Sequence, residues 1–338
     1  MLHLYTRESL NALISKREGE TKFGEKVETL SSQENLVEQL QQSEAKYVLF
    51  GIPEDIGVRA NRGKAGATTA WKAGLKSLLN TQDNAFNKGR RVLVLGHLDF
   101  SELMKRADSF DEKSPEYHIL LSQLVTKIDE EVTYLMFQIV STGKIPIVIG
   151  GGHNNAYGNC KGTALGKSKA INVINFDAHT DFRSLEGRHS GNGFSYAFKK
   201  YFIDKYFMFG LHENYTSKKV FKTIDSCPER IQYNTFEGIH IRQEQGFSFQ
   251  LNTALNFINN RPFGVEVDCD SIENVPSSAM TPSGFTANQA RTFVSFFGNQ
   301  KNAAYLHLCE AAPNPDDPRE MYLIGKLLSY LITDFIRK

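Results

Sequence analysis

Short apolar runs, rich in β-branched and aromatic residues, recur along the chain and alternate with longer stretches of helical periodicity. The runs predict strands at Lys46–Ile52, Arg91–Leu98, Ile145–Ile149, Ile171–Phe176, Tyr206–Leu211, Ile239–Ile241, Phe263–Val267 and Ala304–Cys309. The helical spacing predicts helices at Thr68–Leu79, Tyr117–Ser141, Ser248–Asn259, Ala287–Phe297 and Arg319–Ile336. This alternation is typical of βαβ units and indicates a mostly parallel sheet with helices on both faces.

The expected fold is therefore α/β: a single three-layer αβα domain around a mostly parallel sheet of about eight strands. Residues 1–44 are polar and predict an N-terminal helical extension that packs on a domain of residues 45–338. The chain has no Pro- or Ser-rich linker and no internal repeat. Two glycine-rich segments, Gly150–Gly152 and Gly187–Gly193, lie at or a few residues beyond predicted strands and are interpreted as active-site loops.

Composition narrows the function classes. The 338 residues carry a formal net charge of +1, which gives no electrostatic bias toward nucleic acid or an anionic membrane. The chain shows neither a signal-peptide pattern nor an apolar run long enough to cross a bilayer. The four cysteines form no CxxC pair, which favours a reducing compartment without structural disulfides. We therefore expect a soluble cytoplasmic enzyme with a small-molecule substrate and neither a nucleic-acid nor a membrane partner.

Three predicted strands are followed by histidine or acidic side chains, where ligands bind in open α/β sheets. IPIVIG leads into a glycine turn and a histidine, and the other two strands end in the spacings DAHTD and DCD. Alternate residues of an extended chain point the same way and lie roughly 6–7 Å apart, so each group can converge on one site. The six residues are His153, Asp177, His179, Asp181, Asp268 and Asp270.

Four carboxylates and two imidazoles are ligands that suit hard divalent metals such as manganese, whereas thiolates would favour zinc or iron–sulfur clusters. Four carboxylate charges would balance two divalent cations, and without metal such a cluster would repel itself. A lone DxH or DxD is more often structural, or caps a helix. Three such elements, each after a predicted strand, favour a metal site.

These segments resemble the motifs of the ureohydrolase (arginase-like) superfamily. The resemblance rests on GGGHNNAYG, NFDAHTDFR, VEVDCDSIENVPSSAMTPSGFT and LHLCEAAP, and it extends from GIPEDIGVRANRGKAGA, which starts at Gly51, through Glu310 to the last helix. It implies an arginase-like fold and a binuclear-metal hydrolase. Relatives are often oligomers, so a homo-oligomer is compatible with the resemblance, but no feature of the chain fixes a number.

The resemblance also implies roles for individual residues. Two Mn2+ ions would be bound, the first by His153, Asp177, Asp181 and Asp268, the second by Asp177, His179, Asp268 and Asp270. Together they would activate water for attack on a planar guanidinium or formamidinium carbon. Asp181 would pass a proton to the departing amine, and Glu310 would hold the cationic head.

Two further segments, GVRANRGKAGA and HSGNGFSY, resemble the formimidoylglutamase branch. Arg183 lies two residues past Asp181, where its guanidinium could bind a substrate carboxylate. The predicted reaction is hydrolysis of N-formimidoyl-L-glutamate to L-glutamate and formamide, a step of histidine degradation. The alternatives are an arginase, agmatinase or guanidinobutyrase-like enzyme and, in another class, a catalytically inactive binding protein. Agmatine lacks a carboxylate, so Arg183 argues against it.

Some positions depart from the superfamily pattern. Asn154 and Asn155 follow the motif histidine and have no assigned role. Arginases carry a proton-shuttling histidine before a glycine, where this chain has Ser190, and His189 one residue earlier is a candidate shuttle. Asn192, in the same loop, is a candidate substrate contact together with Arg183 and Glu310.

Overall fold

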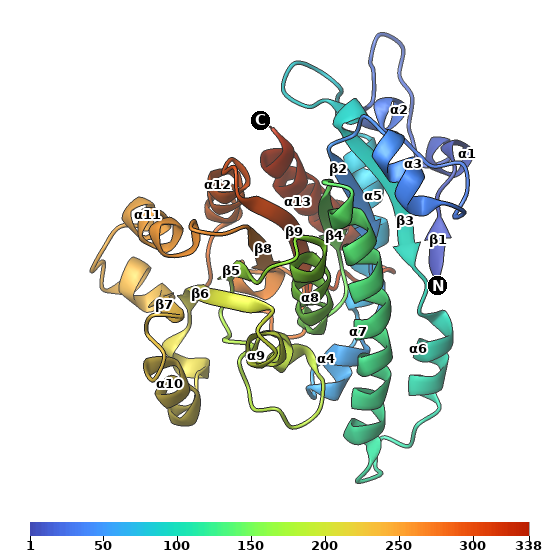
Figure 1. Cartoon of the computed structure of the whole chain (residues 1–338). Coiled ribbons are helices and arrows are strands. Elements are labelled where there is room, and N and C mark those ends of the chain that lie inside the picture. The colour runs from blue at the N-terminus through green and yellow to red at the C-terminus, as the bar shows by residue number, and fades with distance from the viewer. Residues whose placement is uncertain (338) are drawn as a thin grey trace.

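In the computed structural model, which describes residues 1–337, the strands form one nine-stranded sheet of order β1-β3-β2-β4-β9-β8-β5-β6-β7 (Figure 1). Strand β1 pairs antiparallel with β3, and the other neighbours are parallel. The strands are β1 Leu2–Leu4, β2 Tyr47–Gly51, β3 Val92–Leu98, β4 Ile145–Ile149, β5 Ile171–Phe176, β6 Ile203–Leu211, β7 Ile231–Thr235, β8 Phe263–Asp268 and β9 Ala303–Cys309.

Helices cover both faces of the sheet, as expected when consecutive parallel strands need crossover connections. The α-helices are α1 Arg7–Asn11, α2 Phe23–Lys26, α3 Leu36–Gln42, α4 Ile56–Ala60, α5 Ala70–Leu79, α6 Ser101–Asp108, α7 Tyr117–Ser141, α8 Ala156–Gly166, α9 Gly193–Lys199, α10 Lys218–Asp225, α11 Phe247–Ile258, α12 Ala287–Gly298 and α13 Pro318–Ile336. Short 3₁₀ turns lie at Ala67–Thr69, Gly89–Arg91, His153–Asn155, Ser190–Asn192, Glu213–Tyr215 and Cys269–Ser271.

Each face of the sheet has its own apolar core. One core packs the sheet against α5, α11, α12 and α13, and the other packs it against α7, α8 and α9. Figure 1 shows these two sets of helices on opposite sides of the strands. The predicted three-layer αβα architecture is therefore confirmed.

The predicted strands differ from the observed ones in three places. Leu2–Leu4 and Ile231–Thr235 form edge strands that the pattern did not predict, so the sheet has nine strands among residues 1–337 rather than about eight. The predicted strand Ile239–Ile241 is wrong, because these residues lie in a single π-helical turn, Glu237–Ile241. Its apolar residues alternate as in a strand, but Ile239 is buried while Ile241 is exposed.

The N-terminal residues do more than pack on the domain. They include three short helices, α1 to α3, and β1 joins the central sheet through its pairing with β3. A domain boundary near residue 45 stays a prediction.

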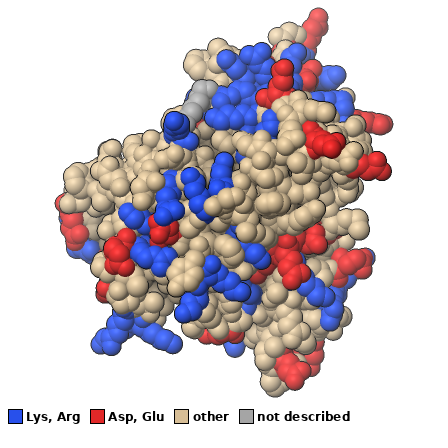
Figure 2. Space-filling view, viewed as in Figure 1, with Lys and Arg blue, Asp and Glu red and all other residues tan. Residues whose placement is uncertain are grey.

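The distribution of charge on the surface and the state of the cysteines both agree with what the sequence predicts. Basic and acidic side chains are interspersed on the face seen in Figure 2. Within residues 1–337, no helix combines the length and apolar character that crossing a membrane requires. All four cysteines are free thiols, and Cys160, Cys269 and Cys309 are buried.

The connections that leave the neighbouring strands β5 and β8 run in opposite directions along the sheet, since β5 leads to β6 and β8 leads back to β9. After β4 the chain does not continue to the neighbouring position but crosses to β5, and β8 and β9 later fill the gap between them. Such a switch point opens a crevice at the carboxyl ends of the strands, where ligands bind in open α/β sheets. Here the four contiguous strands β4, β9, β8 and β5 surround that crevice.

Candidate metal centre

The carboxyl ends of these four strands carry the predicted site residues. The turn after β4 begins with His153, β5 runs into Asp177, β8 ends at Asp268, and Glu310 follows β9. Since these strands are neighbours in the sheet, residues more than 150 positions apart in the chain reach one crevice.

Two aspartates turn the chain at their strand ends. Asp177 Oδ1 accepts a hydrogen bond from the His179 N–H (2.6 Å), and Asp268 Oδ1 accepts one from the Asp270 N–H (2.9 Å). Aspartate favours this local bond to the backbone two residues on, which replaces the interstrand ladder and ends the strand. The same spacing that suggested a metal site therefore also shapes its backbone.

Two site residues adopt a left-handed backbone conformation. The φ angles are +43° at Asp181 and +60° at Glu310. This region is sparsely populated by residues other than glycine and costs about 1–3 kcal/mol, so it persists where surrounding contacts enforce it. Both residues line the same cavity, which fits backbone strain that is retained for function.

One compact group of ligand atoms surrounds His153. Its Nδ1 lies 2.8 Å from Asp181 Oδ2, 3.1 Å from Asp268 Oδ2 and 3.3 Å from Asp177 Oδ2. All four residues are buried, and their ligand atoms lie within 4.8 Å of one another. This group is the set that the resemblance implied for the first metal.

A second compact group surrounds His179. Its Nδ1 lies 3.3 Å from Asp270 Oδ2 and 3.6 Å from Asp177 Oδ1, and the three residues again offer ligand atoms within 4.8 Å of one another. The resemblance adds Asp268 to this set. Asp177 directs Oδ2 to the first group and Oδ1 to the second, which is the arrangement of a bridging carboxylate.

Because the carboxylates are buried and crowded together, the pKa values of three of them are raised. Burial and the neighbouring charge of Asp177 raise the pKa of Asp181 to about 6. Burial, together with the charges of Asp270 and Asp177, raises the pKa of Asp268 well above its usual range. Burial raises the pKa of Glu310 to about 8, and the nearby Asp270 and Asp181 add to the effect. A cluster that holds protons this firmly has a strong electrostatic demand for cations.

The residues present fit divalent metal ions. Carboxylate oxygens and imidazole nitrogens are the donors that such ions prefer, and no thiolate competes among the two groups around His153 and His179. Asp270 Oδ1 is buried and has no hydrogen-bond partner within the described part of the chain. A buried polar atom without a partner is costly, and a cation at this place would satisfy it.

A cavity of about 230 Å³ opens above these groups. Its floor is acidic and contains His179, Asp181, Asp268, Asp270 and Glu310. Polar residues of other loops line its wall and rim: Asn61, Arg183, Ser190 and Tyr215. The cavity thus offers negative charge at the bottom and a guanidinium at the rim.

Arg183 is half-exposed at this rim, with a side-chain exposure of 52%. Its Nη1 donates to Asn61 Oδ1 (2.8 Å), and its Nη2 donates to Glu186 Oε1 (2.9 Å). The arginine also lines a larger neighbouring cavity of about 660 Å³, which shares Thr180 and Tyr215 with the metal-site cavity. The guanidinium therefore borders both cavities.

His189 does not lie on this cavity, contrary to what a proton shuttle needs. It is buried beneath the rim loop, where its Nδ1 accepts from the Gly191 N–H (3.1 Å) and its Nε2 lies 3.3 Å from Glu186 Oε1. Burial and the charge of Arg183 lower its pKa to about 4. Both ring nitrogens are occupied within the loop, so the geometry gives no support to a shuttle role.

Asn192 is also directed into the loop and does not line the metal-site cavity. Its Oδ1 accepts from Arg188 Nη1 and from the His189 N–H, and its Nδ2 donates to the carbonyl oxygens of Ser184 and Gly187. These bonds use the donors and acceptors of the side chain. The residue supports the loop instead of contacting a ligand.

The asparagine pair after His153 has a structural partner that the sequence did not reveal. Asn154 Nδ2 and Asn155 Nδ2 both donate to Glu54 Oε1, at 3.1 and 2.6 Å. Glu54 is fully buried, and its Oε2 accepts from the Ile56 N–H. These bonds fasten the loop that carries the histidine ligand to the segment after β2, about 100 residues earlier in the chain.

Comparison with known proteins identifies the family. A sequence model of the arginase family matches residues 45–332. The chain belongs to the arginase family. It is accordingly an arginase-family hydrolase, as its motifs predict. A formimidoylglutamase of Streptococcus pyogenes is 26% identical over 300 residues, which cover 85% of this chain and 84% of the relative.

Solved structures with the same fold agree with this family. The formimidoylglutamase of Bacillus subtilis has a TM-score of 0.74 at 18% identity and covers 96% of this chain and 93% of its own. The formiminoglutamase of Trypanosoma cruzi, solved with Mn2+, has a TM-score of 0.70 at 18% identity, with coverages of 94% and 100%. The arginase-like fold predicted from the motifs is therefore confirmed.

Proposed function

We propose that this arginase-family hydrolase uses two divalent metal ions to cleave N-formimidoyl-L-glutamate into L-glutamate and formamide. The observation that carries the proposal is the polarity of the cavity, which has five metal-site and acidic residues at its floor and Arg183 at its rim. A ligand with a cationic amidinium head and carboxylates on its tail matches this order of charges. The similarity to the formimidoylglutamase of S. pyogenes supports the same substrate.

The metal ligands in this proposal are the six residues at the strand ends. His153, Asp177, Asp181 and Asp268 would hold one ion, and Asp177, His179, Asp268 and Asp270 the other. Manganese is proposed because the donors are hard and because the T. cruzi protein was solved with Mn2+. When bound, the ions supply Lewis acidity and a lowered pKa for water.

Glu310 is proposed to bind the amidinium head. Its Oε1 accepts from the His153 N–H (2.9 Å), which fixes the carboxylate in the cavity lining. A carboxylate so placed can bind the planar cation through charge-assisted hydrogen bonds.

Asp181 is proposed to transfer the proton that the leaving group needs. Its carboxylate lines the cavity beside Glu310 and belongs to the group around His153, so it lies where it can pass a proton between the attacking water and the leaving nitrogen. Water adds to the formimidoyl carbon and gives a proton to Asp181, the C–N bond to the amino nitrogen of glutamate breaks, and Asp181 passes that proton from its Oδ to the nitrogen. The products are formamide and the free amine.

A substrate panel with manganese tests the proposal. Formimidoylglutamate, arginine, agmatine and 4-guanidinobutyrate are compared, with formamide and urea measured as separate products. We expect formamide release from formimidoylglutamate to have the highest kcat/KM and chelator-treated protein to be inactive. Preferred urea release from a guanidino compound would replace the proposed substrate, and no turnover with any of them would favour the inactive binding protein.

We also propose a cytoplasmic location and a homo-oligomeric state. The free thiols of all four cysteines are in line with a reducing compartment. Fractionation of cells and light scattering of the purified protein test these two points independently of the reaction.

A further inference from the structure

A closed polar network lies behind His153, within the sheet and away from the cavity. Glu266 on β8 and His307 on β9 are directly opposite in the register of the two strands, and Tyr305 lies two residues before His307 on the same face. His307 Nδ1 donates to Glu266 Oε2 (2.6 Å), and the Tyr305 hydroxyl donates to Glu266 Oε1 (2.7 Å). All three side chains are fully buried. Burying a carboxylate costs more free energy than burying an apolar side chain, so the retention of Glu266 here calls for a reason.

The edge of the His153 ring that carries Nε2 points toward this network. Nδ1 faces the aspartates of the metal centre, which leaves Nε2 on the opposite side of the ring. Nε2 is buried and has no hydrogen-bond partner among residues 1–337, and it lies 3.5 Å from Glu266 Oε2. A ligand imidazole binds metal through one nitrogen and donates a proton from the other, usually to a carboxylate or carbonyl.

We propose that Glu266 is a positioning residue of the metal centre, which accepts the Nε2 proton of His153 and so keeps Nδ1 free and aimed at the metal. Tyr305 and His307 hold the carboxylate in place from two sides. His307 Nε2 also lies 3.3 Å from the carbonyl oxygen of Gly150, which ties the network to the glycine turn before His153. This inference rests on the proposed two-metal function.

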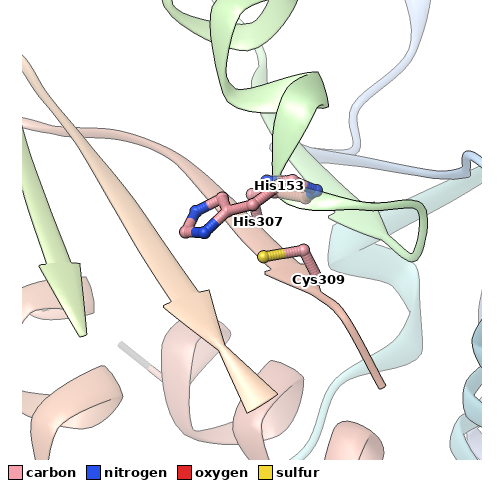
Figure 3. A group of neighbouring side chains, drawn as sticks. All are labelled: His153, His307 and Cys309. Atoms are coloured by element: carbon pink, nitrogen blue, oxygen red, sulfur yellow. The ribbon is translucent and has the colours of Figure 1, made fainter. Parts of the chain in front are cut away.

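A different reading of the same residues is a third metal site. Figure 3 shows His307 and Cys309 beside His153, and their ligand atoms lie within 4.8 Å of one another. However, both nitrogens of His307 already face acceptors, Glu266 and the Gly150 carbonyl. The Cys309 thiol donates to the Val267 carbonyl oxygen, and burial raises its pKa well above the usual range, so it offers no thiolate. The geometry therefore favours a supporting layer for His153.

Titration of Mn2+ into metal-free full-length protein tests the proposal without using activity. Glu266→Met removes the acceptor at similar volume, and we expect it to weaken Mn2+ affinity at one of two sites by about 10–100-fold. Glu266→Gln keeps a weaker acceptor, so its affinity should fall between wild type and Glu266→Met. If Glu266→Met does not fold, the Mn2+ affinity of Glu266→Gln alone decides the test.

Asp334→Leu and Asp334→Asn are the matched controls. Asp334 on α13 is likewise buried, but its carboxylate pairs with Arg291 on α12 and not with the His153 ring. We expect these variants to lower the Tm of the metal-free protein while leaving Mn2+ affinity within about threefold of wild type, well inside the 10–100-fold range. The proposal is overturned if both Glu266 variants bind Mn2+ like wild type, or if the Asp334 variants weaken binding equally. Three ions per wild-type chain would favour the third site instead, and failure of wild type to bind two would count against the metal centre itself.

Discussion

The floor and the rim of the cavity differ in how they are built. The floor consists of largely buried side chains that follow the ends of β5, β8 and β9, with hydrogen bonds from the local backbone to the strand-end residues Asp177 and Asp268. The rim is a loop on which Arg183 is half-exposed and is held by Asn61 and Glu186. Rigid elements hold the reacting groups, and a loop presents the residue that is proposed to select the substrate. Changes at the floor should therefore abolish the reaction, whereas changes at the rim should alter which molecule reacts.

Asp270→Asn is expected to have the largest effect. The substitution removes a charge from the second metal group at nearly constant volume. Lost metal affinity and misplacement of the reacting groups together should lower kcat/KM by at least about 10³-fold. Steady-state kinetics at saturating Mn2+ and metal analysis measure this effect, with the exposed Asp316→Asn as control. Turnover within a factor of about two of wild type would remove Asp270 from the site, because ligand changes cost at least about 10-fold.

The metal-free protein should lose stability as the pH rises from 5 to 8.5. In the folded chain the pKa is raised to about 6 for Asp181 and about 8 for Glu310, whereas unfolded carboxyls titrate near pH 4. The folded state therefore binds more protons across this window, and each unit of displacement contributes about 1.4 kcal/mol that is lost as the pH increases.

Thermal unfolding in chelator at several pH values measures this loss. Adding Mn2+ should remove most of the pH dependence, because metal replaces the protons. Glu310→Gln should flatten the upper part of the curve. A metal-free Tm that rises between pH 5 and 8.5 would contradict the electrostatic account of the floor.

The rim depends on a buried ion pair beneath it. Arg188 Nε donates to Asp129 Oδ2 (2.7 Å) on α7, and Arg188 Nη2 donates to the carbonyl oxygen of Asn154 (2.8 Å). Arg188→Met leaves the aspartate unpaired and should destabilise the protein by about 3 kcal/mol, measured by denaturant unfolding. The double variant Asp129→Leu/Arg188→Met removes both charges and should recover much of the loss. If it does not, the pair is not the main anchor of the loop.

The floor was largely predictable from the sequence. Two strands, Ile145–Ile149 and Ile171–Phe176, and the helix Tyr117–Ser141 have their predicted bounds. The reason is local: a short run rich in apolar, β-branched residues predicts a buried parallel strand, and the spacing of DAHTD or DCD after such a run decides which side chains converge.

The supporting contacts could not be predicted, because they join residues distant in sequence. The partner of Asn155 is Glu54, and the ring of His189 turns toward Gly191 and Glu186 because of hydrogen bonds that no periodicity encodes. The edge strand Leu2–Leu4 is three residues long and exists through its pairing with β3, some 90 residues away. No motif marks Glu266, because it stands inside an otherwise apolar strand.

Arg183→Ala should act on binding of the substrate tail. Loss of a charge-assisted contact costs on the order of 1.5–3 kcal/mol, which is roughly a ten- to hundredfold loss of kcat/KM. Because the tail is bound in ground and transition states alike, most of the loss should appear in KM. Arg183→Lys should also weaken binding, since lysine cannot reproduce the forked contact. Metal content serves as the control, and an unchanged KM in Arg183→Ala would exclude the carboxylate contact.

Glu186→Gln should have the smallest effect, and it should have the opposite sign. Glu186 Oε1 accepts from Arg183 Nη2, so in the free enzyme it competes with a substrate carboxylate for the same guanidinium. Ion pairs as exposed as this one contribute about 0.2–1 kcal/mol, so removing the competing charge should lower KM for formimidoylglutamate by up to about fivefold. The double variant Arg183→Ala/Glu186→Gln isolates the coupling, since Glu186→Gln should leave KM unchanged once the arginine is absent. A KM that increases in Glu186→Gln alone would mean that Glu186 orients Arg183 for the substrate, and the rim would then share the floor's dependence on a fixed geometry.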